Sequence, residues 1–301
     1  MQDNLFSNVR YLTVNDKDKD WGLIITTVGY QSIQANQEYP PKGHPSQYFF
    51  RPSAGRTLQE YQLIYITRGE GHFKSNNIKS SRLEAGNAFL LFPGEWHTYL
   101  PDPDKGWDTY WVGFRGDFST NVETHQFFSR KAPICDLGFN EQIIDLFKQI
   151  IELAKQEKTG FQQVISGITI HLLGLIYYTV RNNLFQDKDI VSRIEKARMI
   201  MREHPGGEVC LDSIAASLNM SYSWFRKMFK QYTGLSPAQY QLWIKLQKAK
   251  ALLIGSSKNI KEIAFLLEFE SSNYFTVFFK QKTGMTPVEF RKISHGSAAA
   301  E

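Results

Sequence analysis

Residues 228–240 read Met-Phe-Lys-Gln-Tyr-Thr-Gly-Leu-Ser-Pro-Ala-Gln-Tyr, and residues 278–290 read Phe-Phe-Lys-Gln-Lys-Thr-Gly-Met-Thr-Pro-Val-Glu-Phe. The two stretches match at a constant separation of 50 residues. The match extends upstream, where Ile214, Ala215 and Leu218 correspond to Ile263, Ala264 and Leu267 at a separation of 49. The chain therefore contains two copies of one supersecondary unit.

Each copy predicts a helix, a tight turn and a second helix, over about 211–232 and about 260–282. In the first copy Phe225, Met228 and Phe229 recur at helical spacing and are expected to face the core. The opposite faces of the two second helices carry Tyr222, Ser223, Arg226, Lys227 and Lys230 in one copy and Ser272, Asn273, Thr276, Val277 and Lys280 in the other. A second helix of this kind suits the major groove of DNA. Two ordinary amphipathic hairpins would explain the inward residues equally well.

The charge distribution favours a nucleic-acid partner for the same region. Residues 190–292 hold 16 Lys and Arg against 8 Asp and Glu, whereas the rest of the chain holds 19 against 22. The repeat therefore coincides with the basic third of the sequence, which is typical of an anion-binding domain.

At these residues the sequence resembles the AraC/XylS family of bacterial transcription regulators. The pattern includes Ile-Ala-x-x-Leu-x-Met-Ser from Ile214, Phe-Lys-x-x-Thr-Gly-x-Ser-Pro-x-x-Tyr from Phe229, and the stretch 245–253. The resemblance implies a seven-helix DNA-binding domain over 190–292, with two helix-turn-helix units joined by a helix at 237–254. Asn219 and Glu268 stand where the family usually has glycine in the turn, and Asn suits that backbone better than Glu.

The resemblance also implies which residues contact double-stranded DNA. Base contacts fall to Ser223, Arg226 and Lys227 in the first unit and to Asn273 and Thr276 in the second. Ser272 belongs to the same outward face. Phosphate contacts fall to Lys230, Lys280, Lys282 and Arg291.

The first part of the chain has a different pattern. From Trp21 to about Phe118, short β-branched and aromatic runs such as 61–67 and 110–114 alternate with turn signals such as Pro93-Gly94. This pattern predicts an all-β barrel or sandwich. The overall expectation is an α+β protein, with a jelly-roll sensor over 1–138 and an all-α domain at the C-terminus.

Residues 84–97 look like the second half-motif of a cupin barrel. Cupin enzymes hold a metal through a His-x-His pair on an earlier strand, and that strand here reads Tyr65-Ile-Thr-Arg-Gly-Glu-Gly-His-Phe73. Only His97 has a counterpart, so we expect no metal, no cofactor and no catalytic residues. A lone histidine of this kind is more often a hydrogen-bonded structural residue.

Period-two alternation puts His97 and Tyr99 on one strand face, and Thr109 and Trp111 on one face of a later strand. Aromatic faces with hydroxyls and an arginine are the chemistry that holds sugars. The stretches 90–99 and 107–114 are also similar to the sugar-binding domain of arabinose-responsive members of the family. That similarity implies ligand contacts from Tyr99, Thr109, Trp111 and Arg56, while a purely structural barrel core remains an alternative. His97, on the same strand face as Tyr99, is the fifth candidate ligand residue.

After Asn140 the apolar period becomes helical, with one stripe over 143–154. A second helix, 161–182, is apolar on more than one face, with Ile165, Ile168, Leu172, Leu173, Leu175, Ile176 and Val180. This excess of apolar surface predicts that the segment 139–185 forms a homodimer. Residues 186–189 are expected to be a linker and 293–301 a flexible tail.

The composition excludes several classes. The longest nearly apolar stretch, 168–180, is too short to cross a bilayer, and the N-terminus resembles no secretion signal. The two cysteines, Cys135 and Cys210, cannot form a disulfide framework. We therefore expect a cytoplasmic protein with no membrane partner.

These observations predict a transcription activator, controlled by a small-molecule effector that is a carbohydrate and contacting RNA polymerase. Two alternatives remain open. One is a cupin enzyme with an accessory nucleic-acid module, and the other is a DNA-binding regulator that needs no ligand.

Overall fold

The computed structural model describes residues 7–40, 51–183, 188–205 and 210–295. The chain divides into two compact units, Met1–Leu184 and Phe185–Glu301. The first is built on antiparallel sheet and the second is helical, as the sequence predicted.

The first unit contains nine strands and four helices within its described residues. The strands are β1 (Ser7–Tyr11), β2 (Ile24–Ile33), β3 (Arg56–Thr57), β4 (Tyr61–Ser75), β5 (Ser81–Glu84), β6 (Asn87–Leu91), β7 (Trp96–Pro101), β8 (Trp107–Arg115) and β9 (Ile134–Asp136). The helices are α1 (Asp16–Lys19), α2 (Asp117–Thr124), α3 (Glu141–Gln156) and α4 (Phe161–Asn183).

Strand β4 belongs to two hydrogen-bonded layers. Its first part joins a sheet ordered β1-β2-β8-β4-β6-β9, and its second part pairs with β5 and β7. The register between β4 and β8 shifts between Ile66 and Arg68, shortly before Gly71, where β4 begins to pair with β7. This arrangement is the cupin-like architecture that the sequence predicted.

Alternate residues of the central strands face two different cores. Leu63 and Tyr65 pack in a core shared with the helices, whereas Ile64 and Ile66 pack with Trp107 in a core between the layers. The period of two along a strand therefore separates a helix-facing surface from an interior-facing one.

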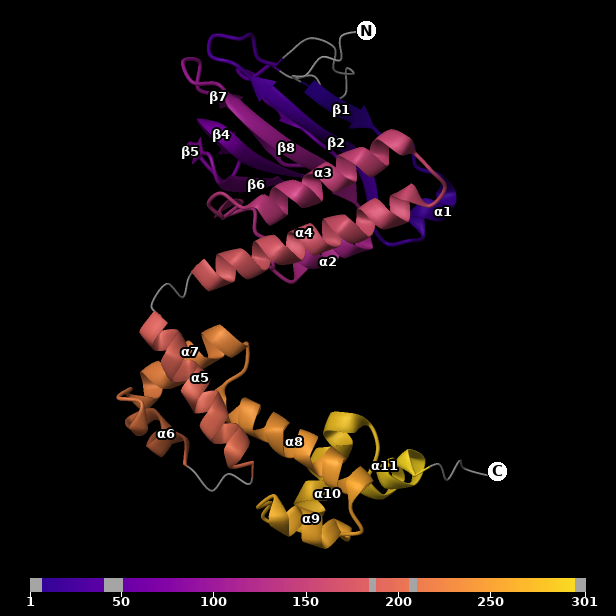
Figure 1. Ribbon diagram of the computed structural model, residues 1–301, viewed down its shortest axis with the longest axis vertical. Helices are drawn as coiled ribbons and strands as arrows, with labels where there is room; N and C mark the ends of the chain where they lie inside the picture. Colours follow the sequence, from indigo (N-terminus) through magenta and orange to yellow (C-terminus); the bar gives the residue numbers. More distant parts are fainter. Residues whose placement is uncertain (1–6, 41–50, 184–187, 206–209, 296–301) are drawn as a thin grey trace. The chain divides into compact units, whose positions relative to one another are not determined.

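Helices α3 and α4 lie side by side across one face of the sheet (Figure 1). The predicted stripe of α3 is buried there, from Ile143 through Phe147 to Ala154. Because both helices share one core with the sheet, the segment predicted as a separate dimerisation element is part of the first unit.

The expectation for α4 was wrong in one respect. The seven apolar residues that were expected to exceed one packing face are buried or half-buried within the unit. The exposed residues of α4 are instead Val164, Gly167, Ile170, His171, Gly174 and Tyr178, followed by 181–183 at its C-terminal end. The helix is also long and apolar enough to cross a membrane by length and composition, a test that the core helix of a globular unit passes as well.

The second unit contains seven helices within its described residues. They are α5 (Lys188–Glu203), α6 (Leu211–Ser217), α7 (Tyr222–Thr233), α8 (Pro237–Gly255), α9 (Ile260–Leu266), α10 (Ser272–Thr283) and α11 (Pro287–Ser294). Helix α5 begins inside the predicted linker and α11 ends inside the predicted tail, while 186–187 and 296–301 lie outside the described residues.

Helix α8 connects two small cores. Its Tyr240 and Ile244 pack with α5, α6 and α7, whereas its Leu246, Ala249 and Leu253 pack with α9 and α10. Each helix-turn-helix unit therefore has a hydrophobic core of its own, with the joining helix contributing to both.

Candidate functional site

A cavity opens between the two layers of the first unit. Its volume is about 50 Å³, which is room for several water molecules. Its walls come from six strands and the segment after β2, and consist of Tyr11, Thr27, Gln31, Tyr39, Pro40, Arg56, Gln62, Ile64, Tyr99, Trp107, Thr109 and Trp111. Four of the five residues that the sequence proposed for the ligand lie together here, and the fifth, His97, does not.

The strand pleat explains why these side chains converge. Gln31 of β2 and Thr109 of β8 are direct cross-strand partners, and both face the cavity. The next pair on the same face is Gly29 and Trp111. A Cβ on Gly29 would lie 2.4 Å from Cζ2 of the Trp111 ring, so the indole occupies the space that the missing side chain leaves.

Arg56 brings a positive charge to the cavity wall. Its Nη2 donates to the Tyr99 hydroxyl at 2.8 Å and to Oε1 of Gln62 at 3.3 Å. Its guanidinium carbon also lies 5.7 Å from the centre of the Tyr99 ring. The arginine and the tyrosine therefore orient each other.

Two tyrosines of the cavity, Tyr11 and Tyr39, keep their protons at neutral pH. Burial raises the pKa of Tyr11 to about 12, against an opposing effect of the nearby Arg56. Burial also raises the pKa of Tyr39 well above its usual value. The wall consequently offers neutral hydroxyls, amides, one guanidinium and indole faces, a set that can hold a polyhydroxylated ligand.

His97 lies behind the cavity wall. Its Nδ1 is 3.0 Å from the Glu95 carbonyl oxygen, which requires the proton on Nδ1, and its ring stacks on Tyr99 with a centroid distance of 6.2 Å. Burial lowers the pKa of His97 to about 4, so the imidazole is neutral. It supports Tyr99 instead of lining the cavity.

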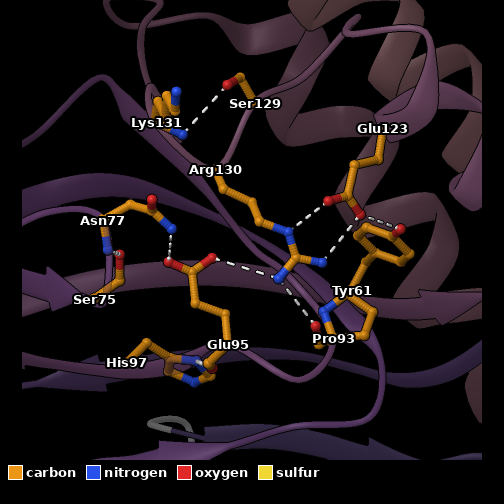
Figure 2. A network of polar contacts seen from close by, with 10 residues as sticks. All are labelled: Tyr61, Ser75, Asn77, Pro93, Glu95, His97, Glu123, Ser129, Arg130 and Lys131. Carbon is orange, nitrogen blue, oxygen red and sulfur yellow. Dashed lines mark hydrogen bonds and ion pairs between the residues drawn. The ribbon is translucent and has the colours of Figure 1, made fainter.

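A polar network surrounds the Glu95 side chain next to His97 (Figure 2). Asn77 donates to the Glu95 carboxylate at 2.9 Å, and Arg130 Nη1 approaches the same carboxylate at 3.8 Å. Arg130 also binds the Glu123 carboxylate of α2 and the Pro93 carbonyl. The network ties α2 to the strand loops on this side of the sheet.

Several residues of the cavity wall were not predicted from the sequence. Thr27, Gln31, Gln62 and Trp107 sit on the interior face of their strands by alternation, which is a signal that the sequence does carry. Tyr11 and Tyr39 come from segments with no such signal. Among the described residues, no group of three or more His, Cys, Asp and Glu side chains could hold a metal ion.

The second unit presents the outward faces of α7 and α10. Ser223, Arg226, Lys227 and Lys230 of α7 are exposed, opposite the buried Phe225, Met228 and Phe229. Tyr222 is different from the expectation, because it is half-buried against the core of this unit.

Helix α10 offers fewer free polar groups than α7. Asn273 and Lys280 are exposed, while Ser272 and Thr276 are half-buried. The Thr276 hydroxyl donates to the Ser272 carbonyl at 2.8 Å, which leaves mainly its methyl group for a base.

Arg291, expected at a phosphate, is half-buried and bonds the Leu253 carbonyl at 3.1 Å. This contact lies at the end of α8. It therefore gives Arg291 a structural role inside the unit.

Comparisons with known proteins match each of the two units to a known domain family. Residues 28–173 match the AraC-like ligand binding domain and residues 214–293 match a helix-turn-helix domain. The MmsAB operon regulatory protein of Pseudomonas aeruginosa is 25% identical, over 80% of this chain and 78% of its own length.

Two further relatives have names that refer to sugars. The raffinose operon transcriptional regulatory protein RafR of Pediococcus pentosaceus is 25% identical, over 77% of this chain and 84% of its own. The lactose operon transcription activator of Staphylococcus xylosus is 26% identical, over 80% and 88%.

Proposed function

Because the chain belongs to the AraC/XylS family of transcription regulators, we propose that it is a transcription activator controlled by a carbohydrate bound in the cavity of its first unit. DNA binding resides in the helix-turn-helix unit and effector binding in the sheet unit. The protein acts in the cytoplasm, carries out no catalysis and recruits RNA polymerase.

The lining of the cavity is the observation that carries the carbohydrate proposal. Trp111 and Tyr99 offer aromatic faces to C–H surfaces, and Thr109, Gln31 and Gln62 offer uncharged hydrogen-bonding groups around them. Arg56 adds donors that suit hydroxyl or ring oxygens. Two relatives named for raffinose and lactose operons, one of them an activator, support the same effector class and outcome.

Thermal unfolding of the full-length protein with a panel of neutral sugars, from monosaccharides to raffinose, tests the proposal. We expect at least one sugar to raise the Tm, and Trp111→Ala to abolish that rise. Trp243→Ala, an exposed tryptophan of the other unit, is the matched control. A panel without any effect would contradict a carbohydrate effector. Bound metal together with turnover would favour a cupin enzyme with an accessory DNA-binding module.

We further infer that the protein is a homodimer through the exposed face of α4. That face runs from Val164 to Tyr178 without a charged residue, although Val164 is 51% and Tyr178 65% exposed. Pairing would raise the effective concentration of the second DNA-binding unit once the first is bound.

Gly174→Arg should shift full-length protein from dimer to monomer in sedimentation at micromolar concentration. Gln149→Glu, on the exposed side of α3, is the control. A wild-type monomer would contradict the inference about α4.

A further inference from the structure

In each helix-turn-helix turn, a residue other than glycine has backbone angles in the left-handed region. Asn219 has a φ of 53° and Glu268 a φ of 51°. The surrounding bonds also agree, since Met220 donates to Ala215 and Phe269 to Ala264, each at 3.0 Å. This conformation is unfavourable for a residue with a Cβ, and more so for Glu than for Asn. A contact from outside the turn that binds its backbone would offset part of this cost.

A cation from the preceding long helix binds the carbonyl of each of these two residues. Nη1 of Arg193, in α5, donates to the Asn219 carbonyl at 3.1 Å and to the Leu218 carbonyl at 3.0 Å. Nζ of Lys245, in α8, donates to the Glu268 carbonyl at 3.3 Å. The carbonyls at the end of a helix lack partners within it, and a cation there is favourable.

The two cations occupy equivalent positions in a repeat of three helices. Ile194, Ala197 and Met201 of α5 are buried against α6 and α7, as Leu246, Ala249 and Leu253 of α8 are buried against α9 and α10. Both triples have the same internal spacing, and Arg193 and Lys245 each directly precede the first member. The repeat therefore includes the long helix, with the contact to the turn conserved between copies by position and chemistry.

We propose that Arg193 and Lys245 are positioning residues for DNA readout. Each holds the turn that sets the angle of the following helix, so Arg193 controls base preference through α7 and Lys245 through α10. The inference rests on DNA binding by these two helices. Neither cation needs to touch DNA for this effect. Ser221, the N-cap residue of α7, lies two residues after Asn219, so a shift of the turn passes directly to the start of the helix.

The two contacts differ in strength. Arg193 bonds two carbonyls, and its Nη2 forms an ion pair with Asp189 at 2.6 Å. Lys245 bonds a single carbonyl at a longer distance, while its ammonium lies 5.2 Å from the centre of the Phe269 ring. The second turn is therefore the less firmly held of the two, although it contains the less suitable residue.

The test begins with a duplex selected from a random library by the full-length wild-type protein. Binding is then measured for every single base-pair substitution in that duplex and for a duplex without the site. The variants are Arg193→Met and Lys245→Met, which keep the aliphatic stem and remove the donors. Lys196→Met and Lys248→Met, exposed on the same helices, control for loss of charge.

We expect Arg193→Met to reduce base discrimination about three- to tenfold in one half of the site, and Lys245→Met to do so in the other half. Binding to the duplex without the site should change less than about twofold, as in the controls. Arg193→Lys and Lys245→Arg should restore discrimination, and these conservative variants report even where a methionine variant is poorly folded.

Equal losses of affinity for all base-pair variants would show that the cations contact phosphates directly. This result would overturn the positioning role and leave the proposed readout by α7 and α10 in place. Failure of Lys245→Arg to retain wild-type discrimination would also overturn it. A wild-type protein that selects no sequence would overturn both this inference and the proposed readout by α7 and α10.

Discussion

Gln162, near the start of α4, forms hydrogen bonds with both backbone groups of Ile25 in β2. Its Nε2 donates to the Ile25 carbonyl at 3.0 Å, and its Oε1 accepts from the Ile25 amide at 3.1 Å. The pairing of β2 with β8 is irregular between Ile25 and Thr27, and Thr27 lines the cavity. One buried side chain thus connects the irregular part of the cavity wall to α4.

We expect Gln162→Leu to lower the free energy of unfolding by about 1–3 kcal/mol, because the variant leaves buried backbone groups unpaired. Urea denaturation, followed through the unfolding transition of the first unit, measures this loss of free energy. Gln163→Leu is the control, since Gln163 is only half-buried and bonds the Asp18 side chain. Equal losses for both variants would contradict a special role for the contact with Ile25.

Gly29→Ala should destabilise the first unit by about 1–3 kcal/mol, because its Cβ would collide with the Trp111 ring. The same change in a Trp111→Leu background should be much less harmful, since the smaller side chain frees the space. A double-mutant cycle from chemical denaturation gives the coupling. Additive effects would show that the strand, and not the indole, resists the new methyl group.

Stability should depend on pH through His97. Its pKa is about 4 in the folded protein against 6.5 for the ordinary group, so the unfolded state binds the proton first as pH falls. The stabilisation is present above pH 6.5 and is lost between 6.5 and about 4, to a total of about 3 kcal/mol. Urea titrations across this range should show a smaller loss for His97→Phe. An identical slope in both proteins would assign the pH dependence to other groups.

Arg226→Ala should weaken binding to a selected duplex by about 1–3 kcal/mol and relax preference at one base pair. Lys280→Ala should weaken all sequences alike and reduce the salt slope by about one, as expected for a phosphate contact. Competition binding at several salt concentrations separates the two effects. An equal loss of affinity for all sequences in Arg226→Ala would show that Arg226 contacts a phosphate.

Several features follow from the sequence because they depend on spacing between near neighbours. Helical periodicity places Phe225, Met228 and Phe229 on one side of α7, and a period of two places Thr109 and Trp111 together in the cavity. The internal repeat likewise specifies two equivalent turns, since a backbone conformation is set largely by the residues of the turn and its caps.

Other features depend on contacts between residues far apart in the chain, which local spacing does not encode. Lys245 reaches Glu268 across 23 residues, and Gln162 reaches Ile25 across 137. His97 shares a strand face with Tyr99, yet its neighbours place it behind the cavity wall. The sequence by itself determined the helix-turn-helix repeat and the faces of the strands. Tertiary packing decided that His97 lies outside the cavity and what holds Glu268, because both depend on where separate elements meet in space.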